Sequence, residues 1–374
     1  MTDTILAIDI GTSSLKAALL PDNLYKREIC VSRQFFSSEA RAENRGAGEW
    51  LSALKSALSE LKEKNPDYGI EAVCVSGNGP TLITDDGKTF MYNEPLPDFS
   101  DFLSESGLSA LQKSKSLFLP RLCAFKKLFP KSYEASEHVF GAPEFLIHAL
   151  TGANLTILPE KRFEAAYWNQ EELEACAFTP DEIKKIPPYL PAGAFAGKVS
   201  EKAALETGLL EGTLVFAGAP DFVVALLGTG TVFPGRLCDR AGTSEGLNLC
   251  TAKPVFAPGL RTLPSVVSGL WNLSYLMKKN PASPGYYREL AQGLDLLRQA
   301  AEANGESFPD CMTITGGQAL DDDLIAKKEA ATALKIRKMP CADGELLGDL
   351  ILARVALGDF DDITEACYGL IGNQ

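Results

Sequence analysis

Residues 5–20, ILAIDIGTSSLKAALL, place one carboxylate, three hydroxyl groups and one lysine around a single glycine, between two apolar runs. Asp9 comes at the end of the first run, and its carboxylate could hold Mg²⁺ directly or through water, because that ion prefers oxygen ligands and keeps several waters. Gly11 lets the backbone turn, so that the amides and hydroxyls after it can point at an anion. With Lys16 close by, these residue types suit a phosphate and its metal.

Two short elements must hold this loop. Residues 5–8 are typical of a buried strand, which predicts that Asp9 lies where the strand emerges. A P-loop would need a helix next, but residues 15–20 are followed at once by a Pro-Asp-Asn stop at 21–23. The pattern therefore favours a second strand and a β-hairpin phosphate loop. The alternative is an ordinary hairpin in which the Asp and Ser residues cap a turn.

Length and composition narrow the class of protein. A chain of 374 residues should form two or three domains. The net charge is −13, and no Lys/Arg cluster interrupts it, which argues against a nucleic-acid or anionic-membrane surface and favours a small-molecule partner. The start of the chain lacks a basic segment and a long apolar segment, and no run is long enough to span a membrane, so we expect a cytoplasmic protein.

Cysteine and histidine usage makes several other sites less favoured. The nine cysteines contain no CxxC pair, and most have apolar neighbours, so buried free thiols are favoured over a metal or disulfide set. Because only two histidines are present, a histidine-based zinc site or a catalytic triad is disfavoured.

The second half of the chain repeats the pattern of the first. In the first half, a helix at 47–64 and a strand at 70–75 precede the turn at 76–80, and a linker-like stretch at 186–197 suggests a domain boundary near residue 212. The second half begins with a strand at 213–217, a turn at 218–221 and an apolar helix start at 222–227. A Gly-Thr-Ser loop follows at 242–244, between strand-like runs. A strand at 312–315 then ends in Gly316-Gly317 before a helix at 321–334. We therefore expect two related α/β domains, residues 1–212 and 213–374, with phosphate loops on facing walls of a cleft.

Six motifs in this order resemble the FGGY carbohydrate kinases, the xylulokinase and glycerol kinase group, along nearly the whole chain. They are the run from Asp9 to Lys16, Leu150-Thr151-Gly152, Gly208-Leu209 with Gly212-Thr213, Gly218-Ala219-Pro220-Asp221, Gly242-Thr243-Ser244 and Thr315-Gly316-Gly317. The resemblance implies an α/β, two-domain actin-like ATPase (ribonuclease H-like) fold, in which Mg²⁺, ATP and a sugar or polyol meet in the interdomain cleft. A homodimer is compatible with this interpretation.

The resemblance also implies roles for individual residues. Asp221 would be the general base that accepts the proton of the alcohol, and Asp9 would position Mg²⁺ and the reacting hydroxyl. These two roles suit phosphoryl transfer, which needs mostly positioning and charge stabilisation, and one carboxylate to accept the proton of the alcohol. The alternative for Asp221 is a helix-capping residue. The implied nucleotide contacts are Gly11, Thr12, Ser13 and Lys16 at the β- and γ-phosphates, Gly242 and Thr243 closing on them, and Gly316 and Gly317 beside the adenosine.

The departures from the family concern mainly the substrate. Where the family usually has Ser-Gly-Gln and then Met-His-Gly, this chain has Ser-Gly-Asn-Gly-Pro, so Asn78 and Gly79 stand in an altered substrate-contact region. The usual Trp-x-Asp-x-Arg segment is not visible in residues 92–101, and only 73 residues separate Gly242 from Gly316, which is short for the family. These departures leave open a degenerate member that binds sugar or nucleotide without turnover. A hydrolase with Ser244 as nucleophile is disfavoured, because both histidines precede that serine.

Overall fold

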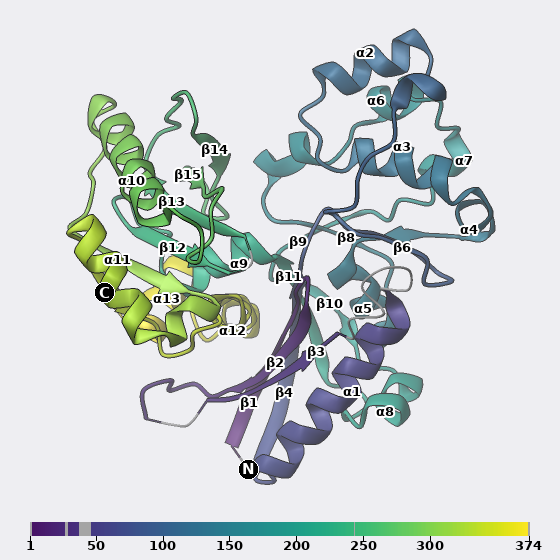
Figure 1. Ribbon diagram of the computed structural model, residues 1–374. Coiled ribbons are helices and arrows are strands. Elements are labelled where there is room, and N and C mark those ends of the chain that lie inside the picture. Colours follow the sequence, from purple (N-terminus) through teal and green to yellow (C-terminus); the bar gives the residue numbers. More distant parts are fainter. Residues whose placement is uncertain (1, 27–28, 37–45, 243, 373–374) are drawn as a thin grey trace. The chain divides into compact units, whose positions relative to one another are not determined.

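The computed structural model describes residues 2–26, 29–36, 46–242 and 244–372 (Figure 1). They form two compact units. The first unit contains the residues up to Leu19 and Cys30–Asp221, and the second contains Leu20–Ile29 and the residues from Phe222 onward. By compactness the division falls after Asp221, because the strand that follows residue 212 joins the sheet of the first unit.

The first unit is built on a six-stranded mixed sheet in the order β10-β11-β4-β1-β2-β3. The strands are β1 (Thr2–Ile10), β2 (Ser14–Leu20), β3 (Cys30–Phe35), β4 (Tyr68–Gly77), β10 (Phe195–Lys198) and β11 (Leu214–Pro220). Strands β1, β4 and β11 are parallel, whereas β2 and β3 pair antiparallel at one side and β10 pairs antiparallel with β11 at the other. The hairpin expected around Gly11 is therefore formed by β1 and β2, which are neighbours in the sheet.

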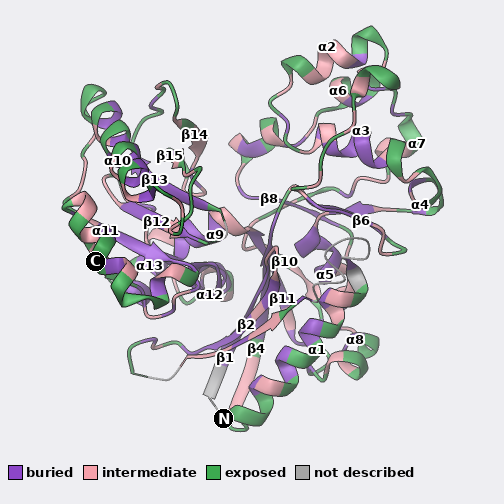
Figure 2. Cartoon of the chain, viewed as in Figure 1, coloured by how far each residue is buried: buried purple, intermediate pink, exposed green. Residues whose placement is uncertain are grey.

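Three helices pack together beside this sheet, α1 (Ala47–Lys64), α5 (Ala142–Thr151) and α8 (Glu201–Thr207). Helix α1 has the bounds that its apolar spacing predicts, and it has both buried and exposed residues (Figure 2). Its buried Trp50, Leu54 and Leu61 belong to the core of the sheet. The Trp50 ring meets Phe145 of α5 edge to face, with 6.3 Å between the ring centres. This packing fixes α5, whose first turn contributes to the site below.

A second, smaller core of the first unit lies among short elements. Its strands are β5 (Leu82–Thr84), β6 (Thr89–Phe90) and β7 (Val139–Phe140), whereas β8 (Thr156–Leu158) and β9 (Tyr189–Pro191) pair with each other and pack on the main core. Its helices are α2 (Glu105–Lys113), α3 (Leu119–Leu128), α4 (Pro130–Ala135), α6 (Gln170–Ala175) and α7 (Pro180–Ile183), with 3₁₀ turns η1 (Phe99–Asp101) and η2 (Lys161–Ala166).

The second unit has its own six-stranded sheet in the order β14-β15-β13-β12-β16-β17. The strands are β12 (Leu237–Ala241), β13 (Glu245–Thr251), β14 (Arg261–Pro264), β15 (Trp271–Leu276), β16 (Cys311–Thr315) and β17 (Lys335–Lys338). The helices are α9 (Asp221–Gly228), α10 (Tyr286–Ala303), α11 (Asp322–Thr332), α12 (Gly344–Leu357) and α13 (Ile363–Ile371), with the 3₁₀ turn η3 (Gly317–Leu320).

The internal repeat suggested by the sequence is visible in the strand order. In the first sheet, β3-β2-β1 is an antiparallel run, and β4 and β11 continue it in parallel. In the second, β15-β13-β12 is antiparallel, and β16 and β17 continue it in parallel. The Gly11 hairpin thus corresponds to the Gly242 hairpin, and the end of β4 corresponds to the end of β16.

No helix among the described residues has the length and apolar character needed to cross a bilayer. None of the nine cysteines, all of which lie in the described part of the chain, forms a disulfide, and seven are buried, as their apolar neighbours predict.

Candidate active site

Two predicted catalytic carboxylates lie where parallel strands of the first sheet end. The altered substrate-contact region, residues 76–80, which we call the substrate loop, lies at the same ends. In the parallel ladder, Asp9 on β1 pairs with Ser76 on β4, and Pro220 on β11 pairs with Gly77. Asp221 follows Pro220 directly and begins α9. Since β4 lies between β1 and β11, the backbones that carry Asp9 and Asp221 are about two strand spacings, roughly 10 Å, apart.

The Gly11 hairpin pairs Asp9 with Lys16. Asp9 is buried, and its Oδ2 lies 3.1 Å from Nζ of Lys16, whose side chain is 14% exposed. The amide of Gly11 donates to the carbonyl of Ser14 at 2.9 Å, and a Cβ at Gly11 would lie only 3.0 Å from that same oxygen. The turn therefore favours glycine, and it keeps a carboxylate and an ammonium group side by side next to the partly exposed backbone of the loop.

The substrate loop is tied to the phosphate hairpin by hydrogen bonds that the sequence did not reveal. The amide nitrogen of the Asn78 side chain donates to the carbonyl of Ile10 at 2.9 Å, and its oxygen accepts from the hydroxyl of Thr81 at 2.5 Å. The Thr81 hydroxyl also accepts from the backbone N–H of Tyr92 at 3.2 Å, and the Tyr92 hydroxyl lies 2.9 Å from that of Thr12. The buried Asn78 side chain thus supports the loop from inside, while Gly79 is exposed.

Tyr92 lies in the segment where the sequence lacks the Trp-x-Asp-x-Arg pattern, and an arginine from elsewhere in the chain holds that segment. Arg121 of α3 is buried and donates to the carbonyls of Met91 and Glu94, both at 2.8 Å. Its guanidinium also lies over the ring of Phe90. An arginine among the apolar residues of the first turns of α3 was the available signal for this role.

Glu144 is a buried carboxylate beside the substrate loop. It lines a small pocket together with Asn78, Gly79 and Pro220. Its Oε1 accepts from the backbone N–H of Ile157 at 2.9 Å, and burial raises its pKa to about 7. An acidic residue in the first turn of a helix is ordinary in sequence, so its burial here could not be foreseen.

In the second unit, the two predicted nucleotide loops touch each other. Gly316 has φ of 93°, and a Cβ on it would lie 2.6 Å from the carbonyl oxygen of Ala241 and 3.0 Å from the amide of Gly242. Only glycine combines this conformation with so close an approach. Gly242 and Gly317 are exposed, whereas Thr243 lies outside the described residues.

The start of α12 lies against the Gly316 turn. The amide of Gly316 donates to the carbonyl of Ala342 at 2.7 Å, and the amide of Gly344 donates to the Thr315 hydroxyl at 2.7 Å. The second unit therefore presents two exposed glycine backbones and a helix N-terminus in one place, which is an arrangement that suits a nucleotide.

The described residues contain no group of three or more His, Cys, Asp or Glu side chains that could hold a metal ion alone. Mg²⁺ commonly takes one or two carboxylates and completes its shell with phosphate oxygens and water. Asp9 is the residue predicted to supply such an oxygen ligand, with the backbone and hydroxyls of the Gly11 hairpin beside it.

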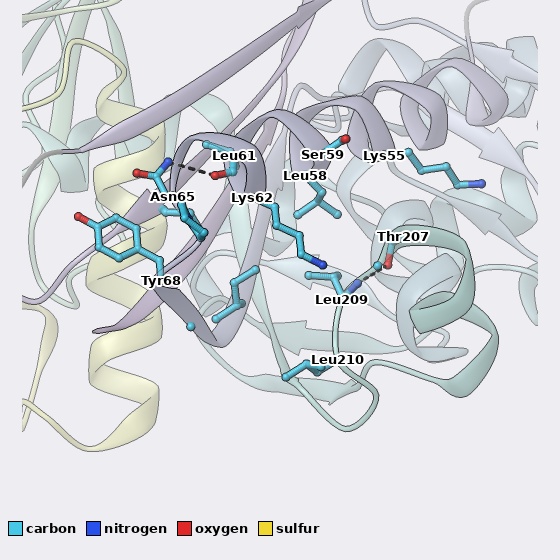
Figure 3. Close-up of a pocket in the computed structure, with 15 residues that line it drawn as sticks. Lys55, Leu58, Ser59, Leu61, Lys62, Asn65, Tyr68, Thr207, Leu209 and Leu210 are labelled. Carbon is cyan, nitrogen blue, oxygen red and sulfur yellow. Dashed lines mark hydrogen bonds between the residues drawn. The ribbon is translucent and has the colours of Figure 1, made fainter. Parts of the chain in front are cut away.

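A separate hollow of the first unit lies between α1, the start of β4 and the residues after α8 (Figure 3). Its apolar floor includes Leu58, Leu61 and Leu209, with Lys55 and Lys62 beside them. Because β4 begins there and ends at the substrate loop, this hollow and the site residues lie at opposite ends of the sheet.

Sequence comparison finds that the chain is similar to known kinases. Xylulose kinase from Lactococcus lactis subsp. lactis is 25% identical over 256 residues, which are 61% of this chain and 49% of that protein. Autoinducer-2 kinase from Yersinia enterocolitica is 32% identical over 105 residues, 28% of this chain and 19% of that protein. The chain thus spans about half the length of the xylulose kinase that it matches. No protein-family model matches the chain.

Solved structures match over nearly the whole chain. A ligand-bound xylulose kinase from Lactobacillus acidophilus superposes with a TM-score of 0.72 at 15% identity, covering 100% of this chain and 93% of that one. Glycerol kinase from Plasmodium falciparum with ADP gives 0.69 at 12% identity, covering 97% and 91%. The chain is therefore similar to xylulose kinases in sequence and in fold, in agreement with the resemblance of its motifs to the FGGY carbohydrate kinases. The predicted class, a two-domain actin-like ATPase fold, is confirmed.

Within this FGGY fold, the predicted residues fall into two groups, one in each unit. Asp9, Gly11, Thr12, Ser13, Lys16, Asn78, Gly79 and Asp221 belong to the first unit, and Gly242, Gly316 and Gly317 belong to the second. Each group is gathered by its own sheet, and the roles of its members stay predictions.

Proposed function

We propose that the chain is an ATP-dependent kinase that phosphorylates a hydroxyl of a small sugar, sugar acid or polyol. The observation that carries the proposal is the placement of Asp9 and Asp221 at the ends of two parallel strands on either side of β4. A spacing of roughly 10 Å between the two backbones leaves room for a phosphoryl group and an alcohol between the side chains. The similarity to xylulose and glycerol kinases supports the same chemistry.

Asp221 is the general base in this proposal. It stands at the first residue of α9, half-buried, next to the pocket that Asn78, Gly79 and Pro220 line. A carboxylate there can accept the proton of an acceptor hydroxyl as the phosphoryl group arrives, and general-base catalysis of this kind is worth about 10²- to 10⁴-fold in rate. The same hydroxyl group of the acceptor would be oriented by the loop that Asn78 supports.

Asp9 and Lys16 serve the phosphates. Mg²⁺, when bound through Asp9, would neutralise phosphate charge during transfer. Lys16 keeps the Asp9 carboxylate compensated in the ligand-free chain and can turn to a phosphate oxygen, since its side chain is partly exposed. The turn at Gly11 offers backbone amides to the same anion, with Thr12 fixed through Tyr92.

The exposed Gly242 and Gly317 and the buried Gly316 of the second unit would hold the nucleotide, with Thr243 as a further contact. Their missing side chains allow the backbone to approach the adenosine and phosphates closely. The loop that departs from the family pattern lines the small pocket beside Glu144, so the substrate is proposed by class.

The test is ADP release from Mg·ATP by the unmodified chain across a panel of ketoses, aldoses, sugar acids and polyols. Turnover that depends on one class of acceptor is the expected result and names that class. ADP binding with no turnover across the panel would instead support a degenerate member that binds nucleotide or sugar without catalysis. Absence of both binding and turnover would overturn the kinase proposal.

A further inference from the structure

A buried polar cluster joins the two glycine loops of the second unit. Its members are Asp239 on β12, Glu245 at the start of β13, Tyr286 at the start of α10, Gln318 in η3 and Lys328 on α11. The side chain of Gln318 donates to Oε2 of Glu245 at 2.9 Å, and the Tyr286 hydroxyl donates to Oε1 of Glu245 at 2.6 Å. The Tyr286 hydroxyl also lies 3.3 Å from the Gln318 side-chain oxygen.

Lys328 supplies the positive charge of this cluster. Its side chain is fully buried, and its Nζ lies 2.5 Å from Oδ2 of Asp239 and 3.2 Å from Oε1 of Glu245. A fully buried lysine is costly unless carboxylates pair with it. The cluster therefore holds one ammonium between two carboxylates, directly behind the hairpin that contains Gly242.

The cluster ends at the exposed nucleotide loops. Glu245 follows the Gly242 hairpin immediately, and Gln318 follows Gly317, which is exposed. Gln318 is itself partly exposed, so the chain of contacts runs from the proposed nucleotide surface to the buried lysine. The hydrogen bond between Gln318 and Glu245 is a side-chain link between the two loops, in addition to the backbone contact of Gly316 with Ala241.

We propose that Gln318 and Glu245 are positioning residues for the nucleotide. Their hydrogen bond sets the spacing of the Gly242 hairpin and the Gly316–Gly317 turn, and Lys328 neutralises the carboxylate that would otherwise repel the phosphates. This inference rests on the proposed function, because it assumes that the two loops hold ADP or ATP. It goes beyond that function by assigning a specific polar pair to nucleotide affinity.

The test exchanges the donor and acceptor of the pair. In Gln318→Glu two carboxylates face each other, and MgADP affinity, measured by calorimetry, should fall about tenfold or more, the size of a lost hydrogen bond to a charged group. The double variant Glu245→Gln, Gln318→Glu places an amide opposite a carboxylate again and restores the net charge of the pair. It should recover part of the affinity, because the link between the loops is restored whereas the carboxylate at residue 318 lacks the pairing with Lys328 that Glu245 has. Glu306→Gln is the matched control, because Glu306 bonds the backbone of Ala252 and Lys253 just beyond the other end of β13.

Thermal unfolding without nucleotide separates positioning from folding. We expect the loss of MgADP affinity in Gln318→Glu to be larger than its change in melting temperature explains. We expect the double variant to regain part of that affinity. A Gln318→Glu variant that binds MgADP like the unmodified chain would overturn the inference, and so would a double variant as weak as the single one. If the unmodified chain itself fails to bind MgADP, the proposed function falls as well.

Discussion

Replacing Glu144 with glutamine should remove a pH dependence of stability that the structure assigns to this one carboxyl. Burial raises the pKa of Glu144 to about 7 from an ordinary value of 4.5. Between these values the folded chain holds a proton that the unfolded chain has already lost. The free energy of unfolding of the unmodified chain must therefore fall as pH rises through this window.

The magnitude follows from the pKa difference. Each pKa unit corresponds to about 1.4 kcal/mol of the free energy of unfolding. Of the total that corresponds to a rise from 4.5 to about 7, about 2 to 3 kcal/mol is lost between about pH 5 and about pH 8. Glutamine keeps an oxygen that accepts from the Ile157 amide and does not titrate. From about pH 5 to about pH 8, the free energy of unfolding of Glu144→Gln should therefore rise by that amount relative to that of the unmodified chain.

Urea unfolding at several pH values, followed by tryptophan fluorescence, measures this difference. Trp50 is a local reporter, because its ring packs on Phe145, the residue after Glu144. Glu137→Gln, at an exposed position before α5, is the control for removing a charge. A difference between the unmodified chain and Glu144→Gln that stays constant from acidic to alkaline pH would refute the reasoning about burial.

Two further substitutions test the second unit. Gly316→Ala should destabilise the chain by about 1 to 3 kcal/mol, because it places a Cβ 2.6 Å from the Ala241 carbonyl at a φ of 93°; a urea midpoint equal to that of the unmodified chain would count against the close contact of the loops. Lys328→Met should cost about 3 to 5 kcal/mol in urea unfolding at neutral pH, since it leaves Asp239 and Glu245 buried without their cation. An unchanged unfolding free energy would contradict the pairing of Lys328 with these two carboxylates.

Local patterns in the sequence predicted the elements that carry the chemistry. The stop at Pro21 favoured a hairpin over a P-loop helix, and β2 ends at Leu20. Apolar spacing predicted α1 residue for residue. These features depend on neighbours within one strand or one helical turn, so a single sequence contains enough information to find them.

Contacts between distant residues could not be predicted in this way. Thr12 and Tyr92 are 80 positions apart, and Lys328 and Asp239 are 89 apart. Each of these polar residues is ordinary in its local pattern, and only the strand order brings it to its partner. The altered substrate loop is similar, because Asn78 marked a departure from the family, whereas its bonds to Ile10 and Thr81 emerge only from the fold.

The internal repeat lies between these extremes. Short Gly-Thr-Ser matches suggested it, and the equivalent strand orders of the two sheets now support it. The sequence indicated which loops correspond, but not that Gly316 touches the Gly242 hairpin, since that contact depends on the register of β12 and β16.

The central claim is that Asp221 accepts the proton of the acceptor alcohol. The most direct measurement compares ADP release by the unmodified chain and by Asp221→Asn with the best acceptor of the panel, and MgADP affinity is measured on both. Asp323→Asn, at an exposed position on α11, is the control. We predict that Asp221→Asn lowers kcat by about 10²-fold or more and leaves MgADP affinity nearly unchanged. Turnover by Asp221→Asn at the unmodified rate would contradict the account.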